Sequence, residues 1–502
     1  MKRTFFIFLA AASLAGCSKL EEKLGSQQGT GASGGGGVTA ASVLAGTYDA
    51  MRTPFQDQSQ WWAAQEHTTD EVIGPTRAGD WDDNGVWRVL HSHQWDPNHA
   101  FLANSFNDLG RIVFSATDML RLSPTPQQAA EGRMLRAMAM FALVEGWDQV
   151  PYRENTADPT EVPKVRKGTA ALDYIIAELE AILPNLPTSP VNRANRDGAK
   201  ALLMKCYLNR GVIANRTAPT FAQADMNKVI TLANEIRVNF TLTPGYFDNF
   251  APTNNVLSTE NIWTAENVGG SSSGNVRSRW FCTLHYNQNP SGWNGFTTLS
   301  DLYNKFDASD VRRGQAYPGM TNVSGIRVGF LRGQQFNQSG VPLTDRTGAP
   351  LAFTDQVKSI ETGSNLEVTG IRVVKYPIDY TGGDNSNNDY VYFRLADVLL
   401  MKAEALLRGG TDPAAQTAVQ LVNQVRARSG VAALGSVNLD QLLDERAREL
   451  YWEGWRRNDL CRFGKYLQAW QEKPASDAKR LIFPIPARSL AANPNLTQNP
   501  GY

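Results

Sequence analysis

"EGRMLRAMAMFALVEGW", residues Glu131–Trp147, decides the fold class of this chain. Its apolar residues recur at i, i+3, i+4, i+7 and i+8, the spacing of one face of an α-helix. They are Met134, Ala137, Met138, Phe141 and Ala142. Small residues on such a face let a second helix approach closely. The stretch therefore predicts a helix that packs tightly against its neighbours.

The same spacing returns in other stretches of 15 to 20 residues. They are Asp197–Gly211, Phe393–Gly410, Asp412–Gly430 and Asn438–Arg457. Gly409-Gly410 predicts a helix end, and Asp412-Pro413 predicts an N-cap followed by a proline in the first turn. The helices are expected in successive pairs, near residues 98–149, 168–214, 221–239 and 390–460. We therefore predict a mainly α fold, a scaffold of degenerate tetratricopeptide-like helical pairs.

The segment from about residue 240 to 390 has a different character. Gly, Asn, Ser and Pro are frequent there, and short runs such as "GIRVGFL" replace the helical spacing. This composition predicts a loop-rich insertion with a few strands. Because long loops on a rigid scaffold commonly carry binding sites, we expect the ligand face here.

The first 17 residues have the pattern of a secretory signal. Lys2 and Arg3 precede the apolar run Phe5–Leu14, which is too short to span a bilayer. "LAGC", Leu14–Cys17, resembles the bacterial lipobox, which implies cleavage and a lipid on Cys17. Residues 18–37 include a Gly/Ser/Gln-rich run and predict a flexible tether of roughly 20 Å root-mean-square length. Residues 38–502 are then the folded domain.

Composition and motifs exclude several functions. Lys+Arg and Asp+Glu both number 49, so no basic field is available to attract nucleic acid. The G-x-G-x-x-G of Gly29–Gly34 follows a signal peptide rather than a strand, so we reject dinucleotide binding. Histidine and cysteine show no zinc spacing, and Cys206, Cys282 and Cys461 form no disulfide framework. No cofactor is predicted.

Six collinear stretches resemble the RagB/SusD-type nutrient-binding outer-membrane lipoproteins of Bacteroidota. They are Ala130–Tyr152, Gly292–Gly314, Asp389–Leu406, Leu421–Gly430, Glu445–Tyr466 and Ile482–Tyr502. The resemblance implies a tetratricopeptide-like scaffold, with helical pairs at about 98–239 and 390–466, and a ligand face on the insertion. It also implies oligosaccharide capture at the cell surface, without catalysis, as a lid on a SusC-like TonB-dependent transporter. Peptides or another nutrient remain an alternative ligand.

A surface glycosidase is the enzymatic alternative. Such enzymes need two carboxyl groups, one of which donates a proton. Glu449 and Glu453 stand at i, i+4 and are expected on one helix, but Arg446, Arg448, Arg456 and Arg457 surround them in sequence. Arginines would keep both acids ionised, so we interpret the group as a structural ion-pair network.

The loop Thr76–Leu90 combines acids and indoles. Asp80, Asp82, Asn84 and Gly85 match the first half of an EF-hand, but His91 stands where the final glutamate is needed. A full EF-hand is rejected, and a looser calcium site on Asp80, Asp82 and Asn84 is left open. Recognition of a sugar ring is the favoured role, because aromatic rings stack on its apolar face while Asp, Asn and Arg pair with its hydroxyls.

Three groups of residues are predicted to form the glycan-binding face. They are Arg77, Asp80, Trp81 and Trp87; Trp280, His285, Tyr286, Trp293 and Asn294; and Arg372, Tyr376 and Tyr390. Trp81 lies between two aspartates that favour water, so we expect it to be exposed. For Trp87 and Trp293, which adjoin hydrophobic residues, core packing and ligand contact are equally open.

Overall fold

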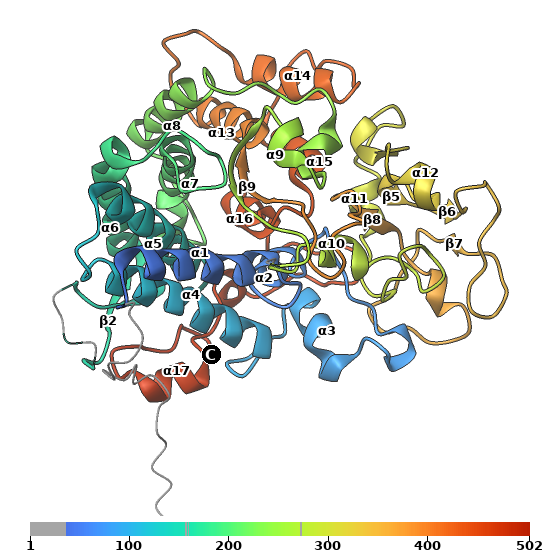
Figure 1. Cartoon of the computed structure of the whole chain (residues 1–502), viewed down its shortest axis with the longest axis horizontal. Coiled ribbons are helices and arrows are strands. Elements are labelled where there is room, and N and C mark those ends of the chain that lie inside the picture. The colour runs from blue at the N-terminus through green and yellow to red at the C-terminus, as the bar shows by residue number, and fades with distance from the viewer. Residues whose placement is uncertain (1–36, 156–157, 159, 272–273) are drawn as a thin grey trace, which may run out of the picture. The chain divides into compact units, whose positions relative to one another are not determined.

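Long helices, stacked one against the next, form the scaffold of the structure, a computed structural model (Figure 1). They are α1 (Ala40–Gln56), α4 (Ala100–Met119), α5 (Pro126–Trp147), α6 (Gly168–Ile182), α7 (Arg196–Ala214), α8 (Gln223–Ile236), α13 (Leu395–Leu407), α14 (Ala418–Arg428) and α15 (Leu439–Leu450). Shorter helices are α2 (Trp61–Glu66), α3 (Val86–His91), α9 (Asn254–Leu257), α10 (Ser278–Phe281), α11 (Ser300–Tyr303), α12 (Thr321–Ser324), α16 (Arg456–Arg462) and α17 (Ala487–Ala492). The predicted mainly α fold is confirmed.

The structure describes residues 37–155, 158, 160–271 and 274–502. Residues Thr39–Tyr502 form one compact unit. The predicted signal peptide, Cys17 and the tether up to residue 36 lie outside the described residues. Within the described part of the chain, no helix combines the length and the apolar character needed to cross a bilayer.

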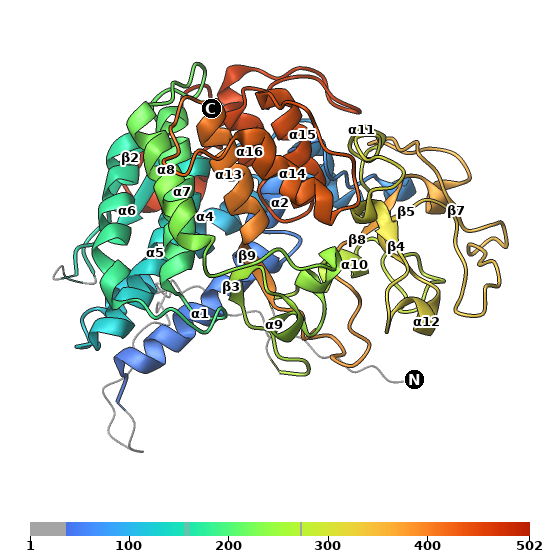
Figure 2. The same ribbon diagram turned by 90° about the horizontal axis from the view of Figure 1, so that it is seen from above.

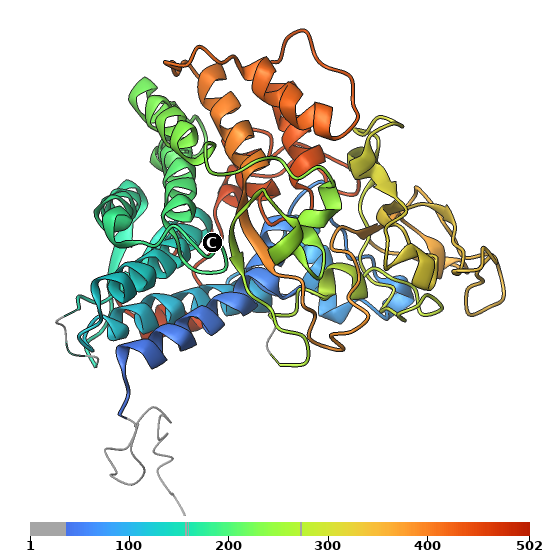
Figure 3. The same cartoon turned by 45° about the horizontal axis from the view of Figure 1, so that its top comes forward.

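Helix α5 shows why this sequence is helical and why it is buried. Thr125 and Gln128 form a capping box, with Pro126 at the first helical position, and Asp148 ends the helix with a left-handed φ of 61°. Every residue from Met134 to Trp147 is buried, because α5 packs against α1 and α4 as well as α6 and α7. The three helices α1, α4 and α5 lie side by side in Figures 1 and 3.

The stack of helices continues across the insertion. Helix α6 packs on α7, α7 on α8, and α8 on α13, which in turn contacts α14 and α15. The predicted pair at 221–239 is therefore wrong: this segment holds one long helix, α8, which packs on α7 and also on α13, a helix that begins more than 150 residues later. The two helices meet because the loop-rich insertion leaves the scaffold and returns to the same point.

Two expected helix boundaries are also wrong. Helix α14 begins at Ala418, where Thr417 provides the cap, and not at Asp412, whose carboxylate instead binds Lys402 at 2.7 Å. Helix α15 ends at Leu450, because Trp452 and Gly454 adopt left-handed φ values of 62° and 82°. Glu453 therefore lies in the turn before α16 rather than on the helix of Glu449.

Short strands connect the insertion to the scaffold and shape it. They are β1 (Gln149–Tyr152), β2 (Lys164–Lys167), β3 (Asn261–Ala265), β4 (Gly314–Gln315), β5 (Val328–Leu331), β6 (Gly333–Gln334), β7 (Ala352–Phe353), β8 (Arg372–Val374) and β9 (Tyr390–Arg394). The antiparallel pair β3–β9 leads into α13, and β4–β5–β8 form a small sheet within the insertion. In Figure 2 this sheet lies at the far end of the compact unit from α6. The predicted loop-rich, partly β insertion is confirmed.

Candidate functional site

An aromatic cleft of about 670 Å³ opens where the loop before α3 meets the insertion. Its lining residues are Gln58, Ser59, Asp80, Trp81, Asp83, Val86, Trp87, Phe101, Tyr286 and Trp293. This volume falls within the range of small-molecule binding sites in proteins. The fold thus brings together Asp80, Trp81, Trp87, Tyr286 and Trp293 of the predicted ligand face.

Trp81 forms the floor of the aromatic cleft. Its side chain is 9% exposed, so the expectation that it is exposed is wrong. The indole N–H donates to the carbonyl oxygen of Trp293 at 3.0 Å, and its ring lies 5.0 Å from that of Phe296. Tight turns in this loop, with left-handed φ at Arg77, Ala78, Asp83 and Asn84, turn the indole inward while Asp80 stays exposed.

Trp293 forms the wall of the cleft and is 44% exposed. Its ring centroid lies 6.2 Å from that of Trp81 and 4.9 Å from that of Phe281. Trp87 is a core residue by comparison, at 4% exposed, and its indole N–H donates to Asp83 at 2.7 Å. Of the two indoles left open by the sequence, Trp293 therefore presents its ring to the cleft and Trp87 supports the floor.

Tyr286 lines the cleft on the side of the insertion, and Arg346 packs against its ring. The Arg346 guanidinium lies 4.0 Å from the centre of the half-buried Tyr286 ring and also pairs with Glu367. Burial raises the pKa of Tyr286, so its hydroxyl is protonated near neutral pH and can donate a hydrogen bond. Arg346 was missed from the sequence, because no local pattern signals that the 333–353 hairpin folds back over Tyr286.

His285 directly precedes Tyr286 in the chain and holds Glu367 and the Asn287 backbone in place. Its side chain is fully buried; Nε2 lies 2.9 Å from a Glu367 oxygen, and Nδ1 accepts from the Asn287 N–H at 3.0 Å. Burial lowers its pKa, although Glu367 opposes the shift. The ring is therefore neutral at pH 7 and donates through Nε2. As a direct ligand contact the prediction for His285 is wrong, since the side chain has no exposed surface.

Arg77 and Arg372 brace the cleft rather than line it. The Arg77 side chain is 3% exposed; it pairs with Glu361 at 3.3 Å and donates to the carbonyl oxygens of Asn294 and Gly295. Arg372, with 0% exposure, donates to the side chain of Asn294 at 2.7 Å. The predicted hydroxyl contacts from Arg77, Arg372 and Asn294 are wrong, because these groups use their polar atoms to tie the Trp81 loop to the Trp293 segment.

The remaining predicted aromatic residues are parts of the core. Trp280 is 3% exposed, and Tyr376 and Tyr390 are 0% and 3% exposed. The Tyr376 hydroxyl accepts from the backbone N–H of Val391, on strand β9. As ligand contacts, the predictions for Trp280, Tyr376 and Tyr390 are wrong, because an aromatic residue in a loop-rich sequence is as well suited to packing as to stacking.

Two glycines allow backbone segments to pack closely against the indoles of this cleft. A Cβ at Gly295 would collide with the indole of Trp81, so only glycine lets the Trp293 segment lie directly on that ring. At Gly74 a Cβ would come within 2.9 Å of the Trp87 side chain. Gly295 lies two residues after Trp293, and the two glycines let backbone segments pack directly on the indoles of Trp81 and Trp87.

Polar groups at the rim of the aromatic cleft come from several segments. Asp80 and Asp83 are exposed, and Gln58 and Ser59 reach the cleft from the turn between α1 and α2. Nothing in the sequence around Gln58 and Ser59 signals a site, because it reads as an ordinary polar turn. Together these groups provide hydrogen-bond acceptors and donors beside the rings.

The candidate calcium oxygens are partly engaged by the protein. Asp82 pairs with the Arg88 guanidinium at 2.5 Å, and Asp83 accepts from Trp87. A guanidinium beside the carboxylate opposes a second cation there. Within the described ranges, no group of three or more His, Cys, Asp or Glu side chains is arranged to hold a metal ion.

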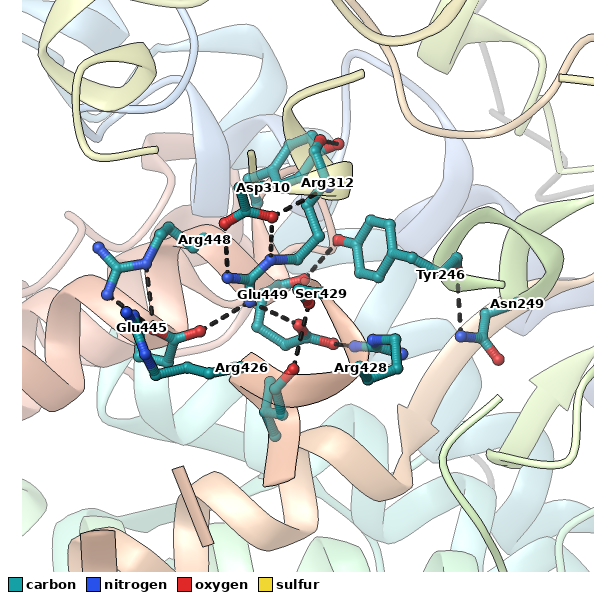
Figure 4. Close-up of polar contacts among 12 residues, drawn as sticks. Tyr246, Asn249, Asp310, Arg312, Arg426, Arg428, Ser429, Glu445, Arg448 and Glu449 are labelled. Atoms are coloured by element: carbon teal, nitrogen blue, oxygen red, sulfur yellow. Dashed lines mark hydrogen bonds and ion pairs between the residues drawn. The ribbon is translucent and has the colours of Figure 1, made fainter. Parts of the chain in front are cut away.

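Glu449 belongs to a buried ion-pair network, as the sequence analysis predicts (Figure 4). It binds Arg312 at 2.8 Å and Arg394 at 2.6 Å, and it also pairs with Arg428. Glu453 pairs with Arg394 and with Lys375. The guanidinium groups hold the pKa of Glu449 well below its usual range against the effect of burial. Such a carboxylate cannot donate a proton at neutral pH.

The four arginines that lie near Glu449 and Glu453 in sequence form ion pairs with other acids. Arg446 binds Asp397 and Asp459, Arg448 binds Glu445, Arg456 binds Asp70, and Arg457 binds Glu145. The real partners come from the insertion, the end of β9 and α14, which sequence spacing could not reveal. Arg312, which also binds Asp310, joins the insertion to helix α15 (Figure 4).

Glu66 and Glu71 form a second buried acidic pair. Both side chains are at most 1% exposed. Glu66 accepts a hydrogen bond from the Gly454 N–H at 2.6 Å, and Glu71 accepts one from the Trp452 N–H at 3.0 Å. Burial raises the pKa of Glu66 to about 7 and that of Glu71 well above its usual value. Raised carboxyl pKa values also occur at catalytic sites, but these two groups line none of the clefts described here. We interpret them as structural.

The geometry defines a class of protein: a tetratricopeptide-like helical scaffold whose loop-rich insertion carries an aromatic cleft. Comparison with known proteins agrees. The SusD family profile matches residues 259–480. The starch-binding protein SusD of Bacteroides thetaiotaomicron is 26% identical over 492 residues, 87% of this chain and 84% of that protein. SusD-like protein P2 of Formosa agariphila is 25% identical and covers 84% and 82% of the two chains.

Solved structures show the same fold. A SusD superfamily protein from Parabacteroides distasonis superimposes with a TM-score of 0.72 at 18% identity, covering 92% of this chain and 98% of that one. Surface glycan-binding protein A of Bacteroides thetaiotaomicron, solved with laminarihexaose, gives a TM-score of 0.67 at 18% identity, over 92% and 98% of the chains. The chain therefore matches the SusD family profile over residues 259–480 and has the fold of SusD superfamily structures.

Proposed function

We propose that this protein is a non-catalytic, cell-surface glycan-binding lipoprotein that captures an oligosaccharide in the aromatic cleft. The observation that carries the proposal is the exposed ring of Trp293 standing beside the indole of Trp81 and the phenol of Tyr286. A sugar ring has an apolar face that stacks on such rings. Asp80 and Tyr286 then offer an acceptor and a donor for its hydroxyl groups.

The relatives support a glycan as the ligand class. One is described as a starch-binding protein, another as a laminarin-binding SusD-like protein, and a third was solved with laminarihexaose. Starch and laminarin are therefore the first ligands to test. Peptides or another nutrient are the alternative ligand class, and a surface glycosidase is the alternative activity.

The absence of catalysis is part of the proposal. A glycosidase needs a proton-donating carboxyl group next to the bound sugar. Burial raises the pKa of Glu66 and Glu71, but neither residue lines the aromatic cleft. At the cleft itself, Asp80 and Asp83 are exposed carboxyl groups, which suits hydrogen bonding to hydroxyls better than proton donation.

Delivery to a transporter completes the proposed role. The family resemblance implies a SusC-like TonB-dependent barrel in the outer membrane as the partner, with Cys17 carrying the lipid anchor. Binding should be of moderate affinity, because each transport cycle requires release as well as capture. Co-purification of the lipidated protein with a barrel protein from outer membranes tests the partnership, and a Cys17→Ala variant that remains membrane-bound contradicts the anchor.

The glycan proposal is tested by affinity electrophoresis of the mature protein through gels that contain starch, laminarin or another neutral polysaccharide. Retardation by at least one glycan, lost in Trp293→Ala, is the expected result. Retention of peptides but of no glycan would favour the alternative ligand class. Release of reducing sugar from a retained glycan would show that the protein is an enzyme.

A further inference from the structure

A second and larger cleft, of about 910 Å³, lies in the insertion outside the aromatic cleft. We call it the arginine groove; its lining is Tyr303, Ala308, Arg313, Gly314, Gly325, Arg327, Phe330, Leu331, Arg332, Gly333, Gln334, Gln335, Phe336, Phe353, Thr354, Asp355 and Gln356. The two clefts share no lining residue. The arginine groove is therefore a separate concave surface next to the sheet β4–β5–β8.

Positive charge is concentrated in this groove. Three guanidinium groups line it, those of Arg313, Arg327 and Arg332, against one carboxylate, that of Asp355. Asp355 is already taken by Arg332, with which it pairs through both oxygens. Within the described residues, neither Arg313 nor Arg327 forms an ion pair with an acidic side chain, although Asp355 attracts Arg313 at longer range. In a chain with no net charge, this leaves an excess of two positive charges in one groove.

Arg313 and Arg327 make few contacts with the protein. Arg313 donates to the Tyr303 hydroxyl at 2.5 Å, and Arg327, which is exposed, reaches the Gly314 carbonyl oxygen at 3.4 Å. A guanidinium carries five N–H donors in a planar fork. Most donors of these two groups are therefore available to a ligand.

Tyr303 fixes the spacing of the cationic groups. The guanidinium of Arg313 lies 4.5 Å from the centre of its ring and that of Arg332 lies 5.7 Å away. Asp355 pairs with Arg332 and also attracts Arg313, so it offsets part of the repulsion between these two cations. Phe336, 45% exposed at the edge of the groove, adds an apolar surface beside the charges.

We propose that the arginine groove binds an acidic saccharide, through the sulfate or carboxylate groups that it carries. Planar guanidinium groups pair with such oxyanions in a bidentate manner, and Phe336 offers a face for the sugar ring. The saccharide nature of the ligand rests on the proposed function, whereas the preference for a negative charge rests on the arginines alone. The site would extend the ligand range from neutral to acidic glycans.

The test compares retention of the mature protein by dextran sulfate and by polygalacturonate with its retention by uncharged dextran, at low and high salt. The parent protein should be retarded by at least one acidic polymer at 50 mM NaCl, and much less at 500 mM, because salt screens exposed charges. Arg313→Gln/Arg327→Gln should bind it at least about tenfold more weakly, the loss expected from two charge-assisted contacts.

Matched variants separate a local effect from a change in net charge or folding. Arg111→Gln/Arg488→Gln removes two exposed arginines that lie outside both clefts and should leave retention unchanged. The single variant Arg327→Gln keeps the contact between Arg313 and Tyr303 and should still weaken binding. It therefore tests the proposal even if the double variant folds poorly. Free sodium sulfate at the same concentration of sulfate groups should compete weakly.

Each result bears on the proposal. Equal retention of the parent and Arg327→Gln, or no retention by either acidic polymer, overturns it. If free sulfate fully displaces the acidic polymer, the groove binds any small anion rather than an acidic saccharide, and the proposal is also overturned. If neutral glycans are retained in a Trp293-dependent manner while acidic polymers are not, this inference fails and the proposed function stands. If no polysaccharide of any kind is retained, the proposed function fails first.

Discussion

Replacing Trp293 by alanine should weaken glycan binding about tenfold without unfolding the protein. Trp293 is 44% exposed, which for a side chain of roughly 250 Å² leaves about 110 Å² in contact with water. A sugar ring that covers half of this area removes about 55 Å² from water. At about 25 cal/mol per Å² the gain is about 1.4 kcal/mol, which corresponds to about tenfold in Kd.

The assay is isothermal titration with the best-retained oligosaccharide, together with thermal unfolding of each variant. Trp293→Phe should keep much of the affinity, because an aromatic face remains. Leu257→Ala is the control, since Leu257 is also 44% exposed but lies on α9 outside the aromatic cleft. Unchanged affinity in a folded Trp293→Ala protein would refute the assignment of the cleft. An equal loss in Leu257→Ala would show that the effect is not local.

Three further predictions concern stability. Trp81→Ala removes the floor of the cleft, a ring 9% exposed, and should lower the free energy of unfolding by about 3–5 kcal/mol in urea titration; a loss below 1 kcal/mol contradicts the packing described. Arg312→Met leaves Asp310 without its ion pair and should cost about 3–5 kcal/mol, so an unchanged thermal midpoint contradicts an anchoring role. Glu66 has its pKa raised by burial to about 7, from 4.5, so its stabilising contribution is complete below pH 4.5 and is lost as the pH rises through 7. The Glu66→Gln side chain cannot ionise, so the free energy of unfolding of this variant should rise relative to the parent by up to about 3 kcal/mol between pH 4.5 and pH 8. Parallel profiles of stability against pH for the two proteins would contradict this prediction.

The candidate site was only partly predictable from sequence. Asp80, Trp81, Tyr286 and Trp293 of the predicted face line one cleft, whereas Trp280, Tyr376 and Tyr390 are core residues, because aromatic residues in a loop-rich segment suit packing as well as stacking. The exposure of Trp81 was wrong. The flanking aspartates indicate that this loop lies at the surface. The indole can still point into the protein, because the loop makes tight turns with left-handed φ values.

Two buried arginines show why charged residues mislead a prediction of ligand contacts. Arg77 and Arg372 look like ligand groups in the sequence, since a charged side chain usually stays in water. Arg372 instead donates to the nearby Thr369 carbonyl oxygen and to the Asn294 side chain. Arg77 is satisfied by Glu361 and by the carbonyl oxygens of Asn294 and Gly295, which lie more than 200 residues away. No local pattern can report such a partner, because the distance in sequence carries no information about which carbonyl groups are left unpaired in the fold.

The sequence by itself determined the helical scaffold and the loop-rich insertion, because helical spacing and caps are properties of neighbouring residues. Only the tertiary structure decided that α8 pairs with α13, that Trp293 rather than Trp87 faces solvent, and that Arg313, Arg327 and Arg332 meet in one groove. These outcomes depend on how distant segments pack, and packing is set by the whole core at once rather than by any stretch of the chain.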